Sequence, residues 1–341
     1  MRGKSLMITY ETVEKGTVNG INVIEYGMKN EALEVRFLNI GGVLTKVAMA
    51  ADNYEQNLVL NYDHIESYFD NGCYLNSIIG RTSNRIKNGQ FTINNQTYQL
   101  DLNNGPNNLH GGSQCLTYAD FEVTQIPSGY ALTTVLPHQE EGFPGNVSIK
   151  VCYTLKDNDF IVSYEATTDQ ETIVNLTQHA YFNLSGNLST TIYNHELQIK
   201  ADYVAEIDEN LSFTEKLIPV ANTLFDFNQP TIIDPKDKEI LPLFEKASGY
   251  DHLYILSDTK DVVTFKDLAS NRTLTVSTTS PSMQFYAGNF LTNDLVFENH
   301  RQGEMHLGAC FETHLIPFDF KSQILKPGDV YSQSTTFTLT K

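Results

Sequence analysis

Residues 175 to 184, Asn-Leu-Thr-Gln-His-Ala-Tyr-Phe-Asn-Leu, concentrate reactive side chains in a short strand-like run. The run places one titratable imidazole, His179, and five amide or hydroxyl groups among apolar residues. Each buried polar group without a partner costs roughly 1–3 kcal/mol. The pattern therefore indicates an internal hydrogen-bond network or a site for a polar ligand. Similar groups around His110 and Glu312 favour a small polyhydroxylated ligand.

Glu312 stands in the second such stretch, Gly-Ala-Cys-Phe-Glu-Thr-His, from residue 308 to 314. A carboxylate placed directly after apolar residues is usually paired or has a shifted pKa, and shifted pKa values are common at functional sites. The alternative is a buried structural ion pair, for which Arg81 is a candidate partner.

Further polar groups occur beside glycine turns. Arg81 and Arg85 flank Asn84, and arginine forks hold carboxylates, phosphates and vicinal hydroxyls equally well. His110 precedes a glycine pair, which permits close approach of the backbone to a ligand but also simply makes turns. Taken singly, each of these groups is more often structural than functional.

Three more segments combine polar side chains with turns or apolar runs. They are the acidic loop at 137–145, Asp251, and a strand that carries Gln284 and Tyr286. Ordinary loop, turn and strand roles are the alternative for each. Because the chain lacks tryptophan, a stacking platform for a sugar must be Tyr or Phe, and the nearest to these motifs are Tyr181, Phe143 and Phe285.

Several classes of chemistry lack their motifs. The sequence has no GxGxxG after a strand, no GxxxxGK[ST], no GxSxG, no HExxH and no HxH pair. What remains is a His/Glu acid–base set surrounded by Arg, Asp, Gln and Asn. The sequence therefore predicts neither a cofactor nor a metal ion.

The composition and charge of the chain disfavour several classes of binding partner. The 341 residues carry a net charge of −18, which argues against nucleic acid and anionic membrane surfaces as partners. Residues Met1–Glu11 contain no apolar segment of signal-peptide length, and no run approaches the ~20 apolar residues of a membrane span. Widely scattered cysteines without a CxxC motif indicate reduced thiols. These features predict a cytoplasmic protein.

Short segments with period-2 alternation recur along the chain and predict antiparallel strands. The clearest lie at 91–93, 121–124, 147–155, 160–166, 197–201 and 274–278. The helix candidates are short, 65–69 and 241–246, and the polar loop 222–238 is expected to be an excursion. No linker or 40–50-residue repeat divides the chain. The prediction is therefore an all-β protein, a large antiparallel β-sandwich with residues 1–341 in a single domain.

The order of these motifs resembles that of the aldose 1-epimerase (galactose mutarotase) family, from about residue 15 to the C-terminus. The matching segments are 80–86, 109–112, 140–145, 175–184, 251–252, 284–289, 311–313 and 325–331. The resemblance implies a galactose mutarotase-like supersandwich and an isomerase of hexose metabolism. Such an enzyme interconverts the α- and β-anomers of free aldohexoses, such as galactose and glucose, without metal or nucleotide. It implies a monosaccharide partner and a monomer or homodimer.

The resemblance also assigns roles to residues. Glu312 would be the general base and His179 the general acid, held in opposite protonation states, with His110 assisting near the ring oxygen. The residues implied to bind substrate are Asn84, Arg85, Tyr181, Asp251 and Gln284.

Departures from the family pattern concern the surroundings of the site. Asn76 stands where glycine is common and Ser83 where alanine is common, while His314 replaces a usual glutamine. The aspartate that usually follows Pro317 is missing, so the groups behind Glu312 are expected to differ. His314 is expected to point the same way as Glu312, because the two are two residues apart on a strand.

Three alternatives stay open at this point. The first is a non-catalytic sugar-binding module on the same fold, and the second is an epimerase for a hexose phosphate. The third is a glycosidase or lyase on a similar sandwich. A glycosidase needs two carboxylates, and only Glu140 or Asp251 could partner Glu312.

Overall fold

Strands dominate this computed structural model, which describes residues 7–234 and 239–341. Parts of the predicted N-terminal segment (1–6) and of the predicted loop excursion (235–238) lie outside the described residues. The all-β prediction is confirmed, and antiparallel pairing links the strands of every described sheet.

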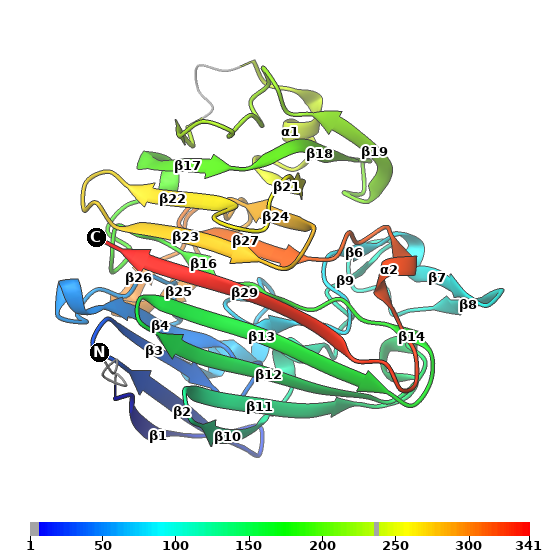
Figure 1. The fold of residues 1–341 in the computed structure, drawn as a ribbon, viewed down its shortest axis with the longest axis horizontal. Coiled ribbons are helices and arrows are strands. Elements are labelled where there is room, and N and C mark those ends of the chain that lie inside the picture. Colours follow the sequence, from blue (N-terminus) through cyan, green and yellow to red (C-terminus); the bar gives the residue numbers. More distant parts are fainter. Residues whose placement is uncertain (1–6, 235–238) are drawn as a thin grey trace, which may run out of the picture.

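The largest sheet contains nine strands and crosses the whole molecule in Figure 1. In spatial order its strands are β10 (Glu122–Ile126), β11 (Gly129–Leu136), β12 (Val147–Lys156), β13 (Asp159–Thr168), β29 (Tyr331–Thr340), β23 (Thr273–Thr278), β22 (Val263–Asp267), β17 (His195–Ile199) and β20 (Thr231–Ile232). Buried and exposed side chains alternate along β12, β13 and β29, so one face of the sheet packs into the core.

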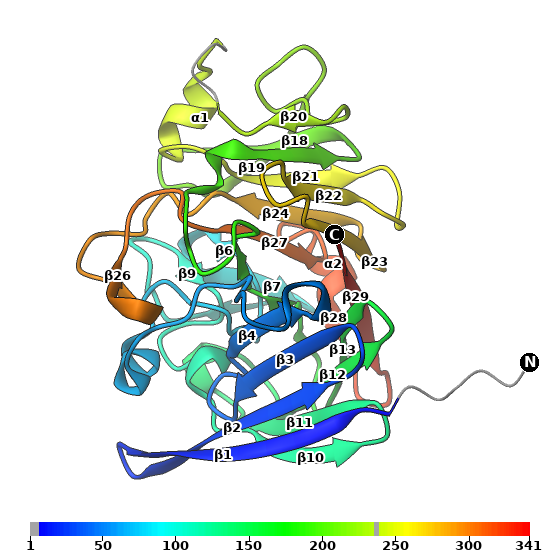
Figure 2. The same ribbon diagram turned by 90° about the vertical axis from the view of Figure 1, so that its left-hand side faces the viewer.

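Two further sheets pack against the inner face of the nine-stranded sheet (Figure 2). The six-stranded sheet consists, in order, of β16 (Tyr181–Phe182), β27 (Ala309–His314), β24 (Ser282–Tyr286), β21 (Asp251–Leu256), β18 (Ala201–Ile207) and β19 (Phe213–Pro219). The four-stranded sheet consists of β1 (Thr9–Val18), β2 (Ile21–Lys29), β3 (Leu33–Leu38) and β4 (Leu44–Met49). This layered arrangement matches the predicted sandwich.

Aromatic side chains join these sheets. Phe37 of β3 meets Tyr153 of β12 edge to face at 5.0 Å between ring centroids. Phe311 of β27 meets Phe265 of β22 at 5.2 Å. Both contacts belong to one continuous hydrophobic cluster. The sheets therefore share a core, and a single domain stays the prediction.

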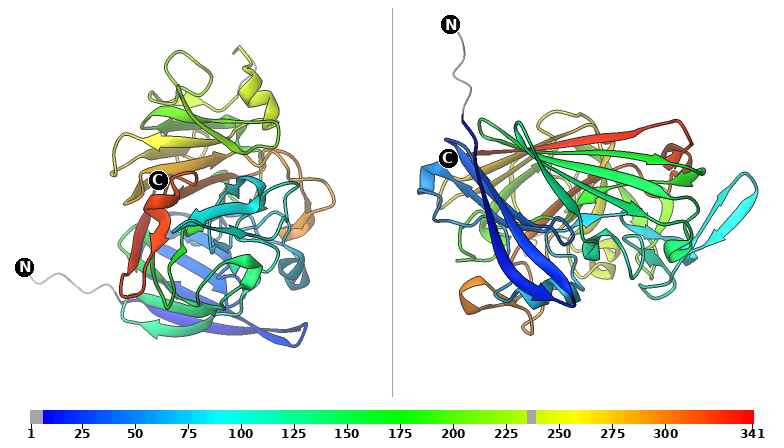
Figure 3. Two further views of the ribbon diagram at one scale, coloured as in Figure 1. Left: turned by 90° about the vertical axis from the view of Figure 1, so that its right-hand side faces the viewer. Right: turned by 90° about the horizontal axis from the view of Figure 1, so that it is seen from below.

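Short ladders and helices complete the fold. The ladders are β5 (Ile78–Ile79) with β15 (Thr177–Gln178), β6 (Arg85–Ile86) with β9 (Asn108–Leu109), β7 (Gln90–Ile93) with β8 (Gln96–Gln99), β14 (Thr172–Ile173) with β28 (Ile324–Leu325), and β25 (Val296–Phe297) with β26 (Arg301–Gln302). The β7–β8 hairpin projects from the body of the molecule (Figure 3). Both predicted helices are present, as the 3₁₀ turn Ile65–Asp70 and as α1 (Pro242–Lys246); α2 spans Phe320–Gln323. No helix within the described ranges has the length and apolar character that a membrane crossing requires.

One strand prediction was wrong. The segment 197–201 reads as a single strand, but β17 ends at Ile199 in the nine-stranded sheet and β18 begins at Ala201 in the six-stranded sheet. Lys200 donates its backbone N–H to Val262 and accepts one from Ser257, and the chain changes layers there. The alternating pattern does not reveal this crossing, because apolar residues recur at every second position in both strands.

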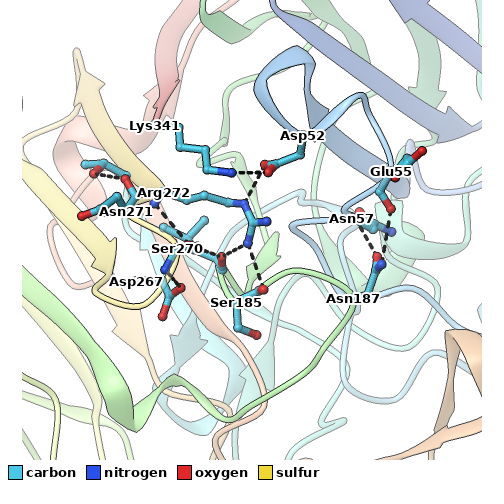
Figure 4. Close-up of polar contacts among 12 residues, drawn as sticks. Asp52, Glu55, Asn57, Ser185, Asn187, Asp267, Ser270, Asn271, Arg272 and Lys341 are labelled. Carbon is cyan, nitrogen blue, oxygen red and sulfur yellow. Dashed lines mark hydrogen bonds and ion pairs between the residues drawn. The ribbon is translucent and has the colours of Figure 1, made fainter.

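A buried ion pair ties early and late parts of the chain together (Figure 4). Asp52, after β4, accepts a hydrogen bond of 2.7 Å from Nε of Arg272, and Lys341 also pairs with it. The Arg272 guanidinium donates to the carbonyls of Leu184 and Ser185 as well. The side chains of Asp52 and Arg272 are only 8% and 6% exposed, so removing one charge leaves the other buried.

Asp52→Asn is expected to lower the free energy of unfolding by about 3–5 kcal/mol, because it breaks a buried pair from one side. The hydrogen bond from Arg272 depresses the pKa of Asp52. The difference in free energy of unfolding between the wild type and the variant should therefore be fully present above the unfolded pKa of about 3.9. It should disappear as the pH falls through the depressed pKa of the folded state. Urea denaturation at several pH values measures it. Glu165→Gln, which breaks the exposed pair with Lys150, is the control and should cost at most about 1 kcal/mol; an equal cost would contradict the prediction.

Candidate active site

Neighbouring strands of the six-stranded sheet aim polar side chains at one cavity. Glu312 on β27 lies directly opposite Gln284 on β24, and Asp251 on β21 projects from the same face. Between them, Phe285 and Phe311 point the other way and stack at 5.6 Å in the core. The period of two thus separates a polar face from an apolar one on the same strands.

The cavity has a volume of about 580 Å³, within the range of small-molecule sites. Its wall comes from loops as well as from the sheet. The lining residues are Asp70, Gly72, Cys73, Tyr74, Asn84, Arg85, Asn104, Leu109, His110, His179, Tyr181, Leu211, Asp251, Gln284, Tyr286, Phe290, Thr292, Asp294, Leu295 and Glu312. Every residue to which the family resemblance assigned a role lies in this wall.

His179 and Glu312 form a buried polar pair in the cavity. Nε2 of His179 lies 3.5 Å from Oε1 of Glu312, and the side chains are 5% and 3% exposed. One donor atom from each of His110, His179 and Glu312 lies within 4.8 Å of the others. The other carboxylate oxygen, Oε2, has no hydrogen-bond partner among the described residues. The pair is therefore placed to exchange a proton with a ligand.

The same three side chains could be considered as metal ligands. A metal-binding histidine usually donates its other ring N–H to an acceptor. Nδ1 of His110 instead accepts the backbone N–H of Asn84 at 3.2 Å, which leaves the proton on Nε2, the nitrogen that would have to bind the ion. The orientation of His110 therefore fits a hydrogen-bond donor better than a metal ligand.

Burial sets the protonation of the central pair. It raises the pKa of Glu312 well above its ordinary range, with a further increase from the charge of Asp251 and an opposing effect of Arg85. It lowers the pKa of His179 to about 4. Both shifts favour the uncharged forms, so the pair shares a single proton that rests on Glu312. The predicted roles of His179 as acid and Glu312 as base therefore require that proton to move from Glu312 to His179.

A chain of side-chain contacts fixes the polar wall. Asn84 donates to Oε1 of Gln284 at 2.9 Å, and Gln284 donates to Oδ1 of Asp251 at 2.6 Å. Arg85 approaches the other oxygen of Asp251 at 3.9 Å and donates from Nε to Asn104 at 3.0 Å. Each side chain is thus oriented by its neighbour, and the wall presents both donors and acceptors.

The glycine pair after His110 serves backbone packing. A Cβ at Gly111 would lie 2.4 Å from the carbonyl oxygen of Gly80, and one at Gly112 would lie 2.4 Å from Oε2 of Glu141. Both glycines also have positive φ, 94° and 105°, which favours glycine. The pair therefore lets the His110 loop approach other protein segments rather than a ligand.

Internal hydrogen bonds satisfy several polar groups of the 175–184 run. Asn175 pairs with the backbone of Leu315 through both its amide oxygen and nitrogen, Gln178 bonds to Asn76 and Tyr153, and Asn183 donates to two carbonyls. Tyr181 donates from its hydroxyl to the carbonyl of Cys73 at 2.8 Å, and its ring lies 5.0 Å from that of His179. The polar side chains of this run thus form a supporting network, and His179 is the residue of the run that can exchange a proton.

Several interpretations made from single motifs were wrong. Arg81 does not pair with Glu312, because its guanidinium donates to the carbonyls of Leu136, Pro137, Pro144 and Gly145. It thereby fixes the acidic loop 137–145, and Glu140 in that loop is not part of the described cavity wall. Phe143 and Phe285, considered as sugar platforms, are buried in hydrophobic clusters.

The departures from the family pattern have structural counterparts. Asn76 adopts φ 54°, a conformation that glycine favours and asparagine tolerates, and its side chain accepts the N–H of Tyr181 at 2.8 Å. His314 is buried, its Nδ1 lies 2.8 Å from the carbonyl of Leu315, and it does not belong to the described cavity wall. Gln323 donates to the carbonyl of Pro317 at 3.0 Å. These residues lie outside the described cavity wall and contact the segments that carry the site residues.

Among the lining residues that were not predicted as site residues, three contact the predicted ones directly. The ring of Tyr74 meets that of His110 at 4.6 Å, Asn104 anchors Arg85, and Tyr286 contacts both His179 and Tyr181. Tyr286 was recognisable, because it lies two residues after Gln284 and shares its strand face. Tyr74 has no local signal, since its place depends on a loop that folds over the sheet.

Comparison with known proteins identifies relatives over most of the chain. The sequence profile of the family described as aldose 1-epimerase matches residues 25–338. Galactose mutarotase of Bos taurus is 34% identical over 92% of this chain and 93% of its own, and aldose 1-epimerase of Escherichia coli is 32% identical over 90% and 92%. The crystal structure of galactose 1-epimerase from Lactobacillus acidophilus superposes with a TM-score of 0.87 at 25% identity, covering 98% and 99% of the two chains.

Proposed function

Because the chain belongs to the aldose 1-epimerase family and is therefore an isomerase of sugars, we propose that it interconverts the α- and β-anomers of free aldohexoses, including galactose and glucose. The observation that carries this proposal is the buried pair of His179 and Glu312, 3.5 Å apart in a cavity with a polar wall. A protein that only bound sugar would not need a proton-sharing pair there.

The proposed reaction opens and closes the sugar ring. With the shared proton on His179, Glu312 takes the proton of the anomeric O1 hydroxyl while His179 donates its Nε2 proton to the ring oxygen. The C1–O5 bond breaks, its electrons go to O5, and C1=O1 forms. The products are neutral Glu312 and neutral His179, the forms that burial favours. Each positioned acid or base contributes roughly 10²–10⁴-fold.

Ring closure then reverses these transfers. Rotation about C1–C2 turns the other face of the aldehyde toward the C5 hydroxyl, which attacks C1 while His179 recovers the proton and Glu312 returns one to O1. His110 directs an N–H donor into the cavity from Nε2, because its Nδ1 accepts from Asn84. We assign to it the stabilisation of charge near the ring oxygen. Asn84, Arg85, Tyr181, Asp251 and Gln284 are assigned to substrate binding or orientation.

Polarimetry tests the proposal. Freshly dissolved α-D-galactose and α-D-glucose should reach their equilibrium rotation faster with the purified protein than without it, in a buffer with chelator and no added metal. Methyl α-D-galactoside is the matched control, because its anomeric oxygen carries no proton and its rotation must stay constant. A spontaneous rate with both sugars would contradict the proposal, and a change with the glycoside would indicate a glycosidase.

Asp251→Asn should move the alkaline limb of the pH–rate profile to lower pH. Turnover requires one proton on the pair, so activity is lost when the pH rises above the raised pKa of Glu312. The negative charge of Asp251 contributes to that rise, and its removal lowers the pKa. The variant should also raise KM by about tenfold or more, because a hydrogen bond to a charged group is worth about 1.5–3 kcal/mol. Polarimetry from pH 5 to 10 measures the limb. An unchanged alkaline limb would contradict its assignment to Glu312 under the influence of the Asp251 charge.

A further inference from the structure

The two histidines of the cavity have different partners at Nδ1. His110 accepts the backbone N–H of Asn84 there, at 3.2 Å. A backbone N–H can only donate, so the ring proton of neutral His110 lies on Nε2. His179 instead has the thiol of Cys310 at 3.5 Å from its Nδ1. A thiol can donate or accept, so the direction of its S–H bears on the tautomer of His179.

The surroundings of Cys310 indicate where that hydrogen points. Its Sγ lies 4.0 Å from the carbonyl oxygen of His179, a group that can only accept. Burial raises the pKa of Cys310 well above the ordinary range, with a further increase from Glu312, so the group is a thiol at neutral pH. With S–H directed to the carbonyl, the lone pairs of sulfur face Nδ1 and accept a hydrogen bond from Nδ1–H.

We propose that Cys310 is a positioning residue that holds His179 as the Nδ1–H tautomer, opposite to the tautomer of His110. The role of this tautomer in turnover rests on the proposed function. It leaves the lone pair of Nε2 free to take the shared proton from Oε1 of Glu312, 3.5 Å away. His110 supplies a fixed donor, and His179 supplies the site that gains and loses a proton.

A neutral sulfur acceptor suits this exchange. A carboxylate at Nδ1 would stabilise imidazolium and retain the proton, whereas a thiol orients the ring with little effect on its charge. The groups that face His179 are Glu312, His110, Tyr74, Tyr181 and Tyr286, with Cys310 behind the ring. Burial raises the pKa of all three phenols, so they stay uncharged while His179 titrates.

Nitrogen NMR of the protein labelled with ¹⁵N-histidine tests the tautomers without reference to turnover. Two-bond ¹H–¹⁵N correlations at pH 7 should give His179 a protonated Nδ1 and His110 a protonated Nε2. Loss of signals in His179→Asn and His110→Asn assigns them. Finding His179 with its proton on Nε2 would overturn the proposal, whatever the polarimetry shows.

Variants of Cys310 test its consequence for activity. Cys310→Val fills the position with apolar atoms but cannot accept a hydrogen bond, and it should lower kcat roughly fivefold to tenfold at constant KM, the loss of about one hydrogen bond. Cys310→Ser keeps an acceptor and should retain most of kcat and the Nδ1–H tautomer. Cys152→Val, on β12 away from the cavity, is the control and should change neither. Equal kcat in the Val and Ser variants, or an unchanged His179 tautomer in Cys310→Val, would overturn the proposal. If Cys310→Val does not fold, the His179 tautomer in the wild type and in Cys310→Ser still tests the proposal, because both should carry the proton on Nδ1.

Discussion

Glu312→Gln is expected to lower kcat by roughly 10²–10⁴-fold while the protein stays folded and binds sugar. The amide has nearly the shape of the carboxyl group but cannot accept the O1 proton. Because burial already favours uncharged Glu312, a neutral replacement should be tolerated by the fold. Polarimetry measures kcat, and titration calorimetry with galactose measures binding.

The matched control for this variant is Glu122→Gln on the edge strand β10, whose side chain is exposed and should leave kcat unchanged. Turnover of Glu312→Gln at the wild-type rate would remove Glu312 from the mechanism. Loss of both binding and the thermal transition would instead assign it a structural role.

His179→Asn is the second change with a large expected effect, a loss of kcat of roughly 10²–10⁴-fold. Asparagine cannot deliver a proton to the ring oxygen. It should also remove the imidazole that lies 3.5 Å from Glu312, so the acid limb of the pH–rate profile, set in the wild type by the His179 pKa of about 4, should change. Stopped-flow polarimetry from pH 3.5 to 9 tests both effects.

His314 offers a control of the same residue type and similar burial. It lies two residues from Glu312 but outside the described cavity wall. His314→Asn should therefore retain KM and most of kcat, with a cost in stability from the lost packing. If His314→Asn loses as much kcat as His179→Asn, proton transfer cannot be assigned to His179 alone.

Local patterns predicted the strands well wherever one face meets water. The alternation at 147–155 and 160–166 appears in the structure as β12 and β13, paired residue by residue. The pattern carries no information at Lys200, where the chain changes sheets between two strands of the same period. Strand existence is local, whereas sheet membership depends on long-range packing.

Site residues could be predicted where an ionisable side chain stands in an apolar run. They could not be predicted where the role of a residue depends on contacts with residues far away in the sequence. A buried Glu312 and His179 are costly enough to be recognised from sequence. Arg81 was ambiguous, because its partners are backbone carbonyls, which any sequence supplies. Phe285 was considered as a platform, but it packs in the core, because the period of two that places Gln284 in the cavity turns its neighbour the other way. Tyr74 could be placed only once the loops were folded.

The opposite faces of β24 and β27 tie the proposed activity to correct pairing of these strands. A one-residue slip of β27 would exchange Glu312 with Phe311, driving a carboxyl group into the aromatic layer and a phenyl ring into the cavity. On the proposed function, a chain with this slip should therefore be inactive. The turnover per milligram of a preparation should measure the fraction of molecules with the right register, which makes a sugar assay a sensitive probe of refolding.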